Sequence, residues 1–135
     1  MHGRLIALLA YYSLPVIMLV TGILWRRFPP RKRNLLYGFR TRWAMLSQET
    51  WDYANRVGAI RMIRGSWVLC LVSAVTHLWF LGDHTKMALV SMTTVQVIGL
   101  FALIAYMWIP VEIDLRKRFD DQGQLRIDCL DRLET

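Results

Sequence analysis

Three long apolar runs divide the chain, and none of them contains a charged side chain. They cover residues 5–25, 65–82 and 87–111, which are 21, 18 and 25 residues long. At about 1.5 Å per helical residue, such runs match a hydrocarbon core about 30 Å thick. A buried helix of a soluble protein would be interrupted by polar residues every few positions. The pattern therefore predicts an all-α membrane protein with three transmembrane helices.

The segment between the first two runs, residues 26–64, has a different pattern. Ser47 is suited to cap a helix N-terminus, and Glu49 then falls in the first turn, where a carboxylate favours the helix dipole. A helix over about 48–64 would be amphipathic, which predicts an interfacial helix within the long loop. Its apolar face would carry Trp51, Ala54, Asn55, Gly58 and Met62.

Charge gives the chain an expected orientation. The net charge is +7, and ten of the 17 Lys and Arg residues lie in the 26–64 loop. The positive-inside rule therefore predicts a cytoplasmic loop, an external N-terminus and a cytoplasmic tail over 112–135. The basic run 26–33 is expected to meet anionic lipid headgroups. Topology accounts for most of the charge, and no nucleic-acid partner is expected.

The tail and the chain's first run add two further expectations. Leu125, Ile127, Leu130 and Leu133 alternate with charged residues in the tail, which favours a short amphipathic docking helix. The first run ends in bulky and basic residues where signal cleavage requires small ones. It is expected to remain as an anchor, so the chain forms a single membrane domain over 1–135.

Reactive side chains are few and scattered. Cys70 lies within the second run and Cys129 in the tail, without the spacing of a metal site or a disulfide framework. No catalytic triad, zinc-protease motif, phosphate loop or dinucleotide glycine pattern is present. The sequence predicts neither an enzyme nor a bound cofactor or metal.

The loop carries a spaced set of polar and aromatic residues: Asn34, Gly38, Arg40, Thr41, Ser47, Trp51 and Asn55. This set resembles the signature of the SdpI-like family. This family contains membrane immunity proteins against sporulation-delaying toxin and many small relatives. The resemblance covers the loop and the three-helix layout, although the better-known immunity protein has additional spans before this module.

The resemblance implies a multi-pass protein of the bacterial cell membrane. It also implies protection against a membrane-active peptide toxin, coupled to the recruitment of a cytoplasmic transcription regulator. The motif residues have two compatible interpretations. In the first, they all form a structural clasp that folds the loop against the helices, with Asn34 and Asn55 pinning the loop to the ends of the spans. In the second, they form a ligand- or partner-binding site, in which the guanidinium of Arg40 can bind a lipid phosphate, a carboxylate or helix-end carbonyls.

Two polar residues within the predicted spans define an alternative hypothesis. His77 and Gln96 can line a path through a small transport or permeation module, which would require a homo-oligomer because three helices enclose no wide channel. The simpler interpretation is that they form hydrogen bonds between helices. Pro15 is expected to kink the first helix.

Overall fold

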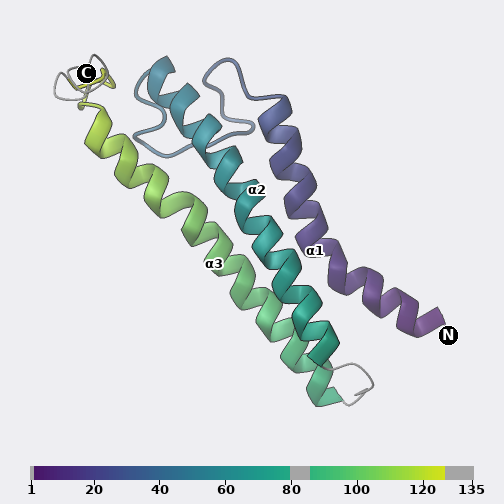
Figure 1. Cartoon of the computed structure of the whole chain (residues 1–135). Coiled ribbons are helices and arrows are strands. Elements are labelled where there is room, and N and C mark those ends of the chain that lie inside the picture. Colours follow the sequence, from purple (N-terminus) through teal and green to yellow (C-terminus); the bar gives the residue numbers. More distant parts are fainter. Residues whose placement is uncertain (1, 80–85, 127–135) are drawn as a thin grey trace, which may run out of the picture.

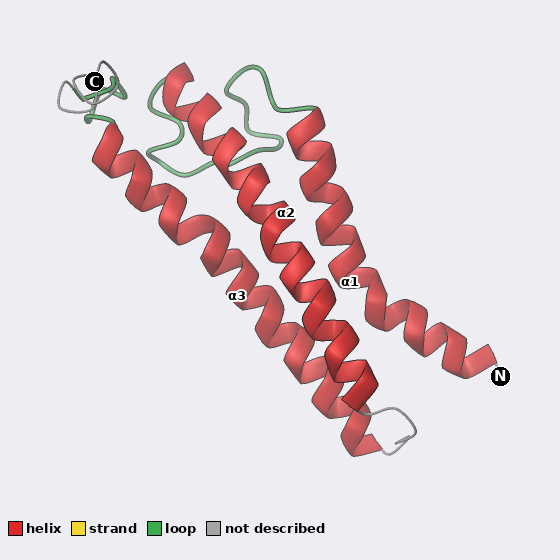
Figure 2. Ribbon diagram, in the orientation of Figure 1, coloured by secondary structure: helices red, strands yellow, loops and turns green. Residues whose placement is uncertain are grey.

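The computed structural model describes residues 2–79 and 86–126, with side chains described from Leu8 onward except that of Lys86. Within these ranges the fold is three helices and their connections, and no strand is present beyond an isolated bridge between Phe119 and Leu125 (Figure 2). The helices are α1 (His2–Arg27), α2 (Gln48–Trp79) and α3 (Lys86–Arg118). All three are long and apolar enough to cross a membrane.

The central helix is α2, which packs against both α1 and α3 (Figure 1). The C-terminus of α1, the N-terminus of α2 and the C-terminus of α3 meet at one end, together with the connection from Phe28 to Ser47. We call this the loop end. The buried hydrophobic cluster of the described chain lies here and combines loop and helix residues: Phe39, Ala44, Ala54, Val111, Leu115 and Phe119.

The apolar side chains away from the loop end are mostly exposed. Leu71, Ile98 and Phe101 have 65%, 62% and 68% of their surface accessible, although each lies in the middle of a helix. So much exposed apolar surface on helices of spanning length is typical of contact with lipid. The described chain is therefore a multi-pass membrane protein whose polar packing is concentrated at the loop end.

α2 differs from the predicted layout. We expected an interfacial helix over 48–64 and a separate span over 65–82, but one unbroken helix of 32 residues runs through both. At about 1.5 Å per residue it is about 48 Å long, which exceeds a hydrocarbon core of about 30 Å by several turns. The face predicted to be apolar is buried, as Trp51, Ala54 and Asn55 show. It packs against the loop and the other helices.

The first and third helices also extend beyond the predicted runs. α3 continues through the basic residues that end at Arg118, and a tight turn at Asp120–Gln124 follows it. Residues 112–118 of the predicted tail thus belong to α3, and the described residues after Arg118 form a turn and an isolated bridge rather than a helix. The predicted docking helix involves Ile127, Leu130 and Leu133, which lie outside the described residues, as do residues 83–85 between the second and third apolar runs.

α1 bends in its N-terminal half, as Figure 1 shows. Pro15 lies inside this helix and is fully buried. A proline has no backbone N–H, so the carbonyl four residues earlier, that of Tyr11, loses its helical partner. The kink expected from Pro15 is present, and the released carbonyl is used by another helix, as described below.

Candidate functional site

Ser47 caps the N-terminus of α2 and connects it to the turn after α3. Its hydroxyl accepts the amide of Thr50 at 3.1 Å, which is the N-cap interaction predicted from the sequence. The Thr50 hydroxyl in turn accepts the amide of Ser47 at 2.9 Å. Ser47 Oγ also donates to the carbonyl of Gly123 at 2.7 Å. The cap therefore fixes the chain after α3 against the start of α2.

Asn55 is the centre of the loop's attachment. It is 2% exposed, and its Oδ1 accepts both the backbone amide of Phe39 at 2.9 Å and the indole Nε1 of Trp25 at 3.1 Å. Its Nδ2 donates to the carbonyl of Trp51 one helical turn earlier, at 2.8 Å. One buried amide thus joins the end of α1, the loop and α2.

Gly38 and Trp51 complete this attachment. Gly38 has a φ of +111°, and a Cβ at this position would lie 2.6 Å from Asn55 Oδ1, so both its conformation and its surroundings favour glycine. Trp51 is fully buried, and its Nε1 donates to the carbonyl of Pro30 at 2.8 Å. We call Gly38, Trp51 and Asn55, with their partners Trp25 and Phe39, the clasp.

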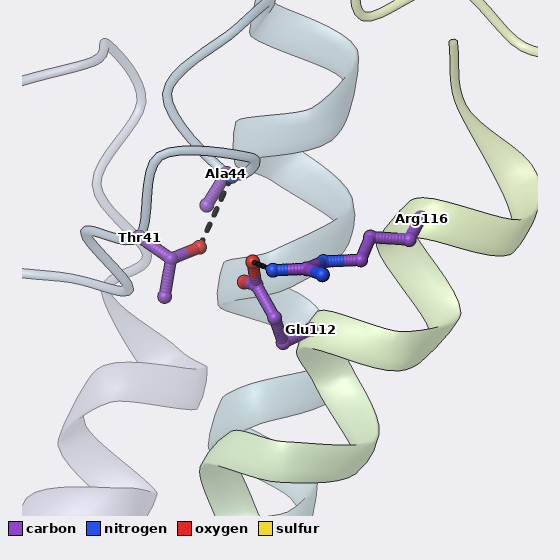
Figure 3. Close-up of polar contacts among 4 residues, drawn as sticks. All are labelled: Thr41, Ala44, Glu112 and Arg116. Carbon is purple, nitrogen blue, oxygen red and sulfur yellow. Dashed lines mark hydrogen bonds and ion pairs between the residues drawn. The ribbon is translucent and has the colours of Figure 1, made fainter. Parts of the chain in front are cut away.

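Thr41 leads the loop toward α3. Its side chain is buried, and its hydroxyl accepts the amide of Ala44 at 3.2 Å (Figure 3). The same figure shows Glu112 and Arg116 of α3, which pair at 3.4 Å. The guanidinium of Arg116 also lies 5.8 Å from the ring centre of Trp43, next to this turn. The loop therefore crosses from α1 to the C-terminal part of α3.

Asn34 and Arg40 lie outside the clasp. Asn34 was predicted to pin the loop to the helices, but it forms a local turn by accepting the amides of Leu36 and Tyr37 at 2.9 and 3.0 Å. Arg40 is exposed, and its Nη1 donates to the carbonyl of Leu35. The structure thus brings Gly38, Trp51 and Asn55 together, and it leaves Asn34 and Arg40 outside this cluster.

An apolar pocket of about 890 Å³ lies beside the clasp. α1 contributes Leu24 and Trp25, α2 contributes Met62, and α3 contributes Met107 and Trp108. The loop closes one side with residues 35 and 37–41, and among all the lining residues Arg40 alone is charged. Its size is within the range of about 300–1,000 Å³ that is common for small-molecule sites. We call it the loop pocket.

A second groove, of about 840 Å³, also lies at the loop end and is strongly charged. Its lining includes Trp25, Asn55, Tyr53, Phe119 and Leu125, and its charged residues are Arg26, Arg31, Glu49, Asp52 and Arg56. The two hollows therefore differ in chemistry, although both border the residues of the clasp.

An ion pair connects α2 to α3 below the clasp. Arg61 Nη2 lies 3.5 Å from a carboxylate oxygen of Asp114, and its guanidinium lies 5.7 Å from the ring centre of Tyr106. Arg61 is not among the residues of the predicted apolar face, yet its side chain is only 24% exposed. A carboxylate on the facing helix explains how an arginine is accommodated here, and this partner is 53 positions away in the sequence.

The polar residues within the helices form interhelical hydrogen bonds. Gln96 of α3 is 5% exposed, and its Nε2 donates to the Tyr11 carbonyl at 2.7 Å and to Ser73 Oγ at 3.1 Å. The Tyr11 carbonyl is the one released by Pro15. His77 Nδ1 lies 2.8 Å from the hydroxyl of Tyr12. Gln96 and His77 thus connect α1 with α3 and α2, respectively, as the interhelical interpretation predicts.

Several residues of the site were not singled out from the sequence. Trp25 and Phe39 supply the donors that converge on Asn55, and Pro30 supplies the carbonyl that Trp51 binds. Arg33 donates to the carbonyls of Met45 and Leu46, both at 2.9 Å. The aromatic content of the loop and its borders was visible in the sequence, but the partners of each residue come from distant segments.

The fold and site define a helical, multi-pass membrane protein with a folded loop at one end. A family model described as the SdpI/YfhL protein family matches residues 31–111, which is more than half of the chain, and the chain belongs to this family. The uncharacterized protein YfhL of Bacillus subtilis (strain 168) is 43% identical over 53 residues, which cover 39% of this chain and 48% of that protein. The match therefore spans about half of the relative's length. No solved structure matches the chain.

Proposed function

We propose that this protein is an immunity protein of the bacterial cell membrane that protects against a membrane-active peptide toxin. In this proposal the loop end and the C-terminus face the cytoplasm, and the N-terminus faces the exterior. Family membership supports the immunity role, and the ten Lys and Arg residues between positions 26 and 64 support the orientation. The single observation that carries the proposal is that three residues of the loop motif, Gly38, Trp51 and Asn55, build the clasp.

Recruitment of a cytoplasmic transcription regulator is the second part of this proposal. The charged groove presents basic and acidic side chains together at the loop end, a mixture that suits a protein surface better than an apolar ligand. The Ser47–Gly123 hydrogen bond connects this region to the chain after α3. A movement of α1, α2 or α3 at the loop end would therefore alter the surface offered to the regulator.

A protection assay tests the proposal. Deletion of the gene is expected to increase sensitivity to a secreted toxin of the host or its neighbours, and the wild-type gene is expected to restore resistance. Asn55→Ala breaks the clasp and should fail to restore it, with the membrane level of the protein checked by immunoblotting. Thr94→Ala is the matched control, because Thr94 is exposed and its hydroxyl bonds within its own helix.

Deletion cells that resist all of these toxins as well as the parent strain would contradict the immunity role. Equal protection by Asn55→Ala and Thr94→Ala, at equal membrane levels, would separate the clasp from the function. For the regulator, a cytoplasmic protein should co-purify from native membranes with the wild-type chain. Recovery of no specific protein from those membranes would remove this second part.

A further inference from the structure

The loop pocket lies at the depth where lipid headgroups meet hydrocarbon. Leu24 and Trp25 belong to the last turns of α1, directly before Arg26 and Arg27. Charged side chains such as these stay near the membrane surface, and tryptophan is enriched at the same level. The pocket therefore extends from the headgroup region toward the bilayer interior, whether the loop end faces the cytoplasm or the exterior.

The walls of the loop pocket suit a hydrocarbon chain. α1 and α3 form its two sides and both pack mainly against α2, so the pocket lies between outer helices that face lipid. Side chains at its rim are exposed, with Phe28 at 65% and Trp108 at 50%. A bilayer acyl chain can reach these walls without crossing a polar barrier.

Arg40 gives the loop pocket a site for one negative charge. A guanidinium carries five N–H donors, and the hydrogen bond to the Leu35 carbonyl engages Nη1. The side chain is exposed, and its planar donors suit the bidentate binding of a phosphate. Leu35 and Leu36 are 77% and 88% exposed beside it, so the loop tip offers apolar surface next to the charge.

We propose that the loop pocket binds an anionic phospholipid of the surrounding bilayer, with one acyl chain between α1 and α3 and the phosphate at Arg40. A lipid fits better than a peptide because the pocket combines one cation with walls that are otherwise uncharged. This inference goes beyond the proposed function, since a bound lipid requires no toxin and no regulator.

Native mass spectrometry of the full chain in detergent tests the headgroup contact. After delipidation, the wild-type protein should retain added phosphatidylglycerol in preference to phosphatidylcholine. Arg40→Gln removes a charge-assisted hydrogen bond, so this preference should fall about tenfold. Arg42→Gln is the matched control, because Arg42 is an exposed arginine two positions away that does not line the pocket. Circular dichroism serves as the check that both variants keep their helices.

A phosphatidylglycerol analogue with a diazirine in the middle of one acyl chain tests the location. Labelling is expected at Leu24, Met62 and Met107, within the loop pocket, in excess over Val75 and Ile98 on other exposed parts of the helices. Equal labelling of both groups would overturn the proposal. So would an equal loss of preference in Arg40→Gln and Arg42→Gln, or no preference in the wild type. Displacement of the bound label by an acidic amphipathic peptide, without any headgroup preference, would favour a peptide site instead.

Discussion

Asn55→Ala is the substitution that tests the clasp most sharply. It removes the one acceptor shared by the Phe39 amide and the Trp25 indole N–H, at a position that is 2% exposed. Phe39 itself is 4% exposed, so its amide cannot gain water while the loop stays in place. The variant therefore leaves two donors without their acceptor at the centre of the loop end.

The magnitude follows from these two donors. A buried donor that loses its acceptor costs about 1–3 kcal/mol, so the pair costs about 2–4 kcal/mol if the two effects partly overlap. Alanine improves the helix propensity of α2 by less than about 1 kcal/mol, which offsets only part of this loss. The opening free energy of the loop should fall by about 1.5–3 kcal/mol, which corresponds to roughly 10- to 150-fold faster amide exchange.

Hydrogen–deuterium exchange of the full chain in detergent micelles measures this effect. The peptide that contains Phe39 should exchange faster in Asn55→Ala, whereas the C-terminal half of α2 should not change. Asn34→Ala is the matched control in the same loop, since it releases the amides of Leu36 and Tyr37 only. Unchanged exchange at Phe39 in Asn55→Ala, or equal deprotection in both variants, would refute the reasoning.

Three further substitutions test other parts of the structure. Gly38→Ala places a Cβ 2.6 Å from the Asn55 amide oxygen at a φ of +111°. It should lower the free energy of thermal unfolding in detergent by about 1–3 kcal/mol, and a variant as stable as the wild type would contradict this close contact. Gln96→Leu should cost about 0.6–1.7 kcal/mol in the same assay, because a carbonyl of α1 loses its donor, and an effect no larger than that of Thr94→Ala would argue against the interhelical bond. Ser47→Ala removes the N-cap of α2 and should cost about 1 kcal/mol, with faster amide exchange in the turn after α3, and an unchanged turn would show that the two ends are not coupled.

The three membrane-length helices could be predicted because run length and the absence of charge are properties of the sequence alone. Their ends could not be predicted in the same way. The start of the uncharged run at residue 65, directly after Arg64, indicated a boundary between an interfacial helix and a span, yet α2 continues through it. Arginines indicate where a helix leaves the hydrocarbon core, but they do not mark where the helix itself ends. A helix can continue through arginines when water or protein contacts accommodate their side chains. For Arg61 these contacts are supplied by Asp114 and Tyr106.

The motif of the loop was identifiable from its residues, and the N-cap role of Ser47 followed from local rules. The partners of Asn55 did not, because Trp25 and Phe39 reach it only when α1, the loop and α2 have assembled. Asn34 shows the opposite error. It was assigned a long-range role, although asparagine commonly accepts amides two or three residues later in the chain, as it does here.

The link between Pro15 and Gln96 combines both kinds of information. The sequence indicates that Pro15 leaves one carbonyl of α1 without a helical partner. It also indicates that Gln96, a polar residue in an apolar run, forms hydrogen bonds with another helix. Gln96 donates to the carbonyl that Pro15 releases, and this hydrogen bond depends on the packing of α1 near α3. Polar residues within these spans can therefore be recognised from the sequence, but their hydrogen-bond partners cannot be identified from it.

The central claim is that the loop folds back across the helices in the membrane, and cysteine cross-linking between the loop and α3 tests it most directly. The rings of Phe39 and Trp108 lie 5.9 Å apart. In native membranes, with Cys70 and Cys129 replaced by serine, a Phe39→Cys and Trp108→Cys pair should be joined by a short bifunctional thiol-reactive cross-linker. A matched pair at Leu36, which is 88% exposed, and Trp108 should not. Absence of the first cross-link, or equal yields for both pairs, would contradict the folded loop.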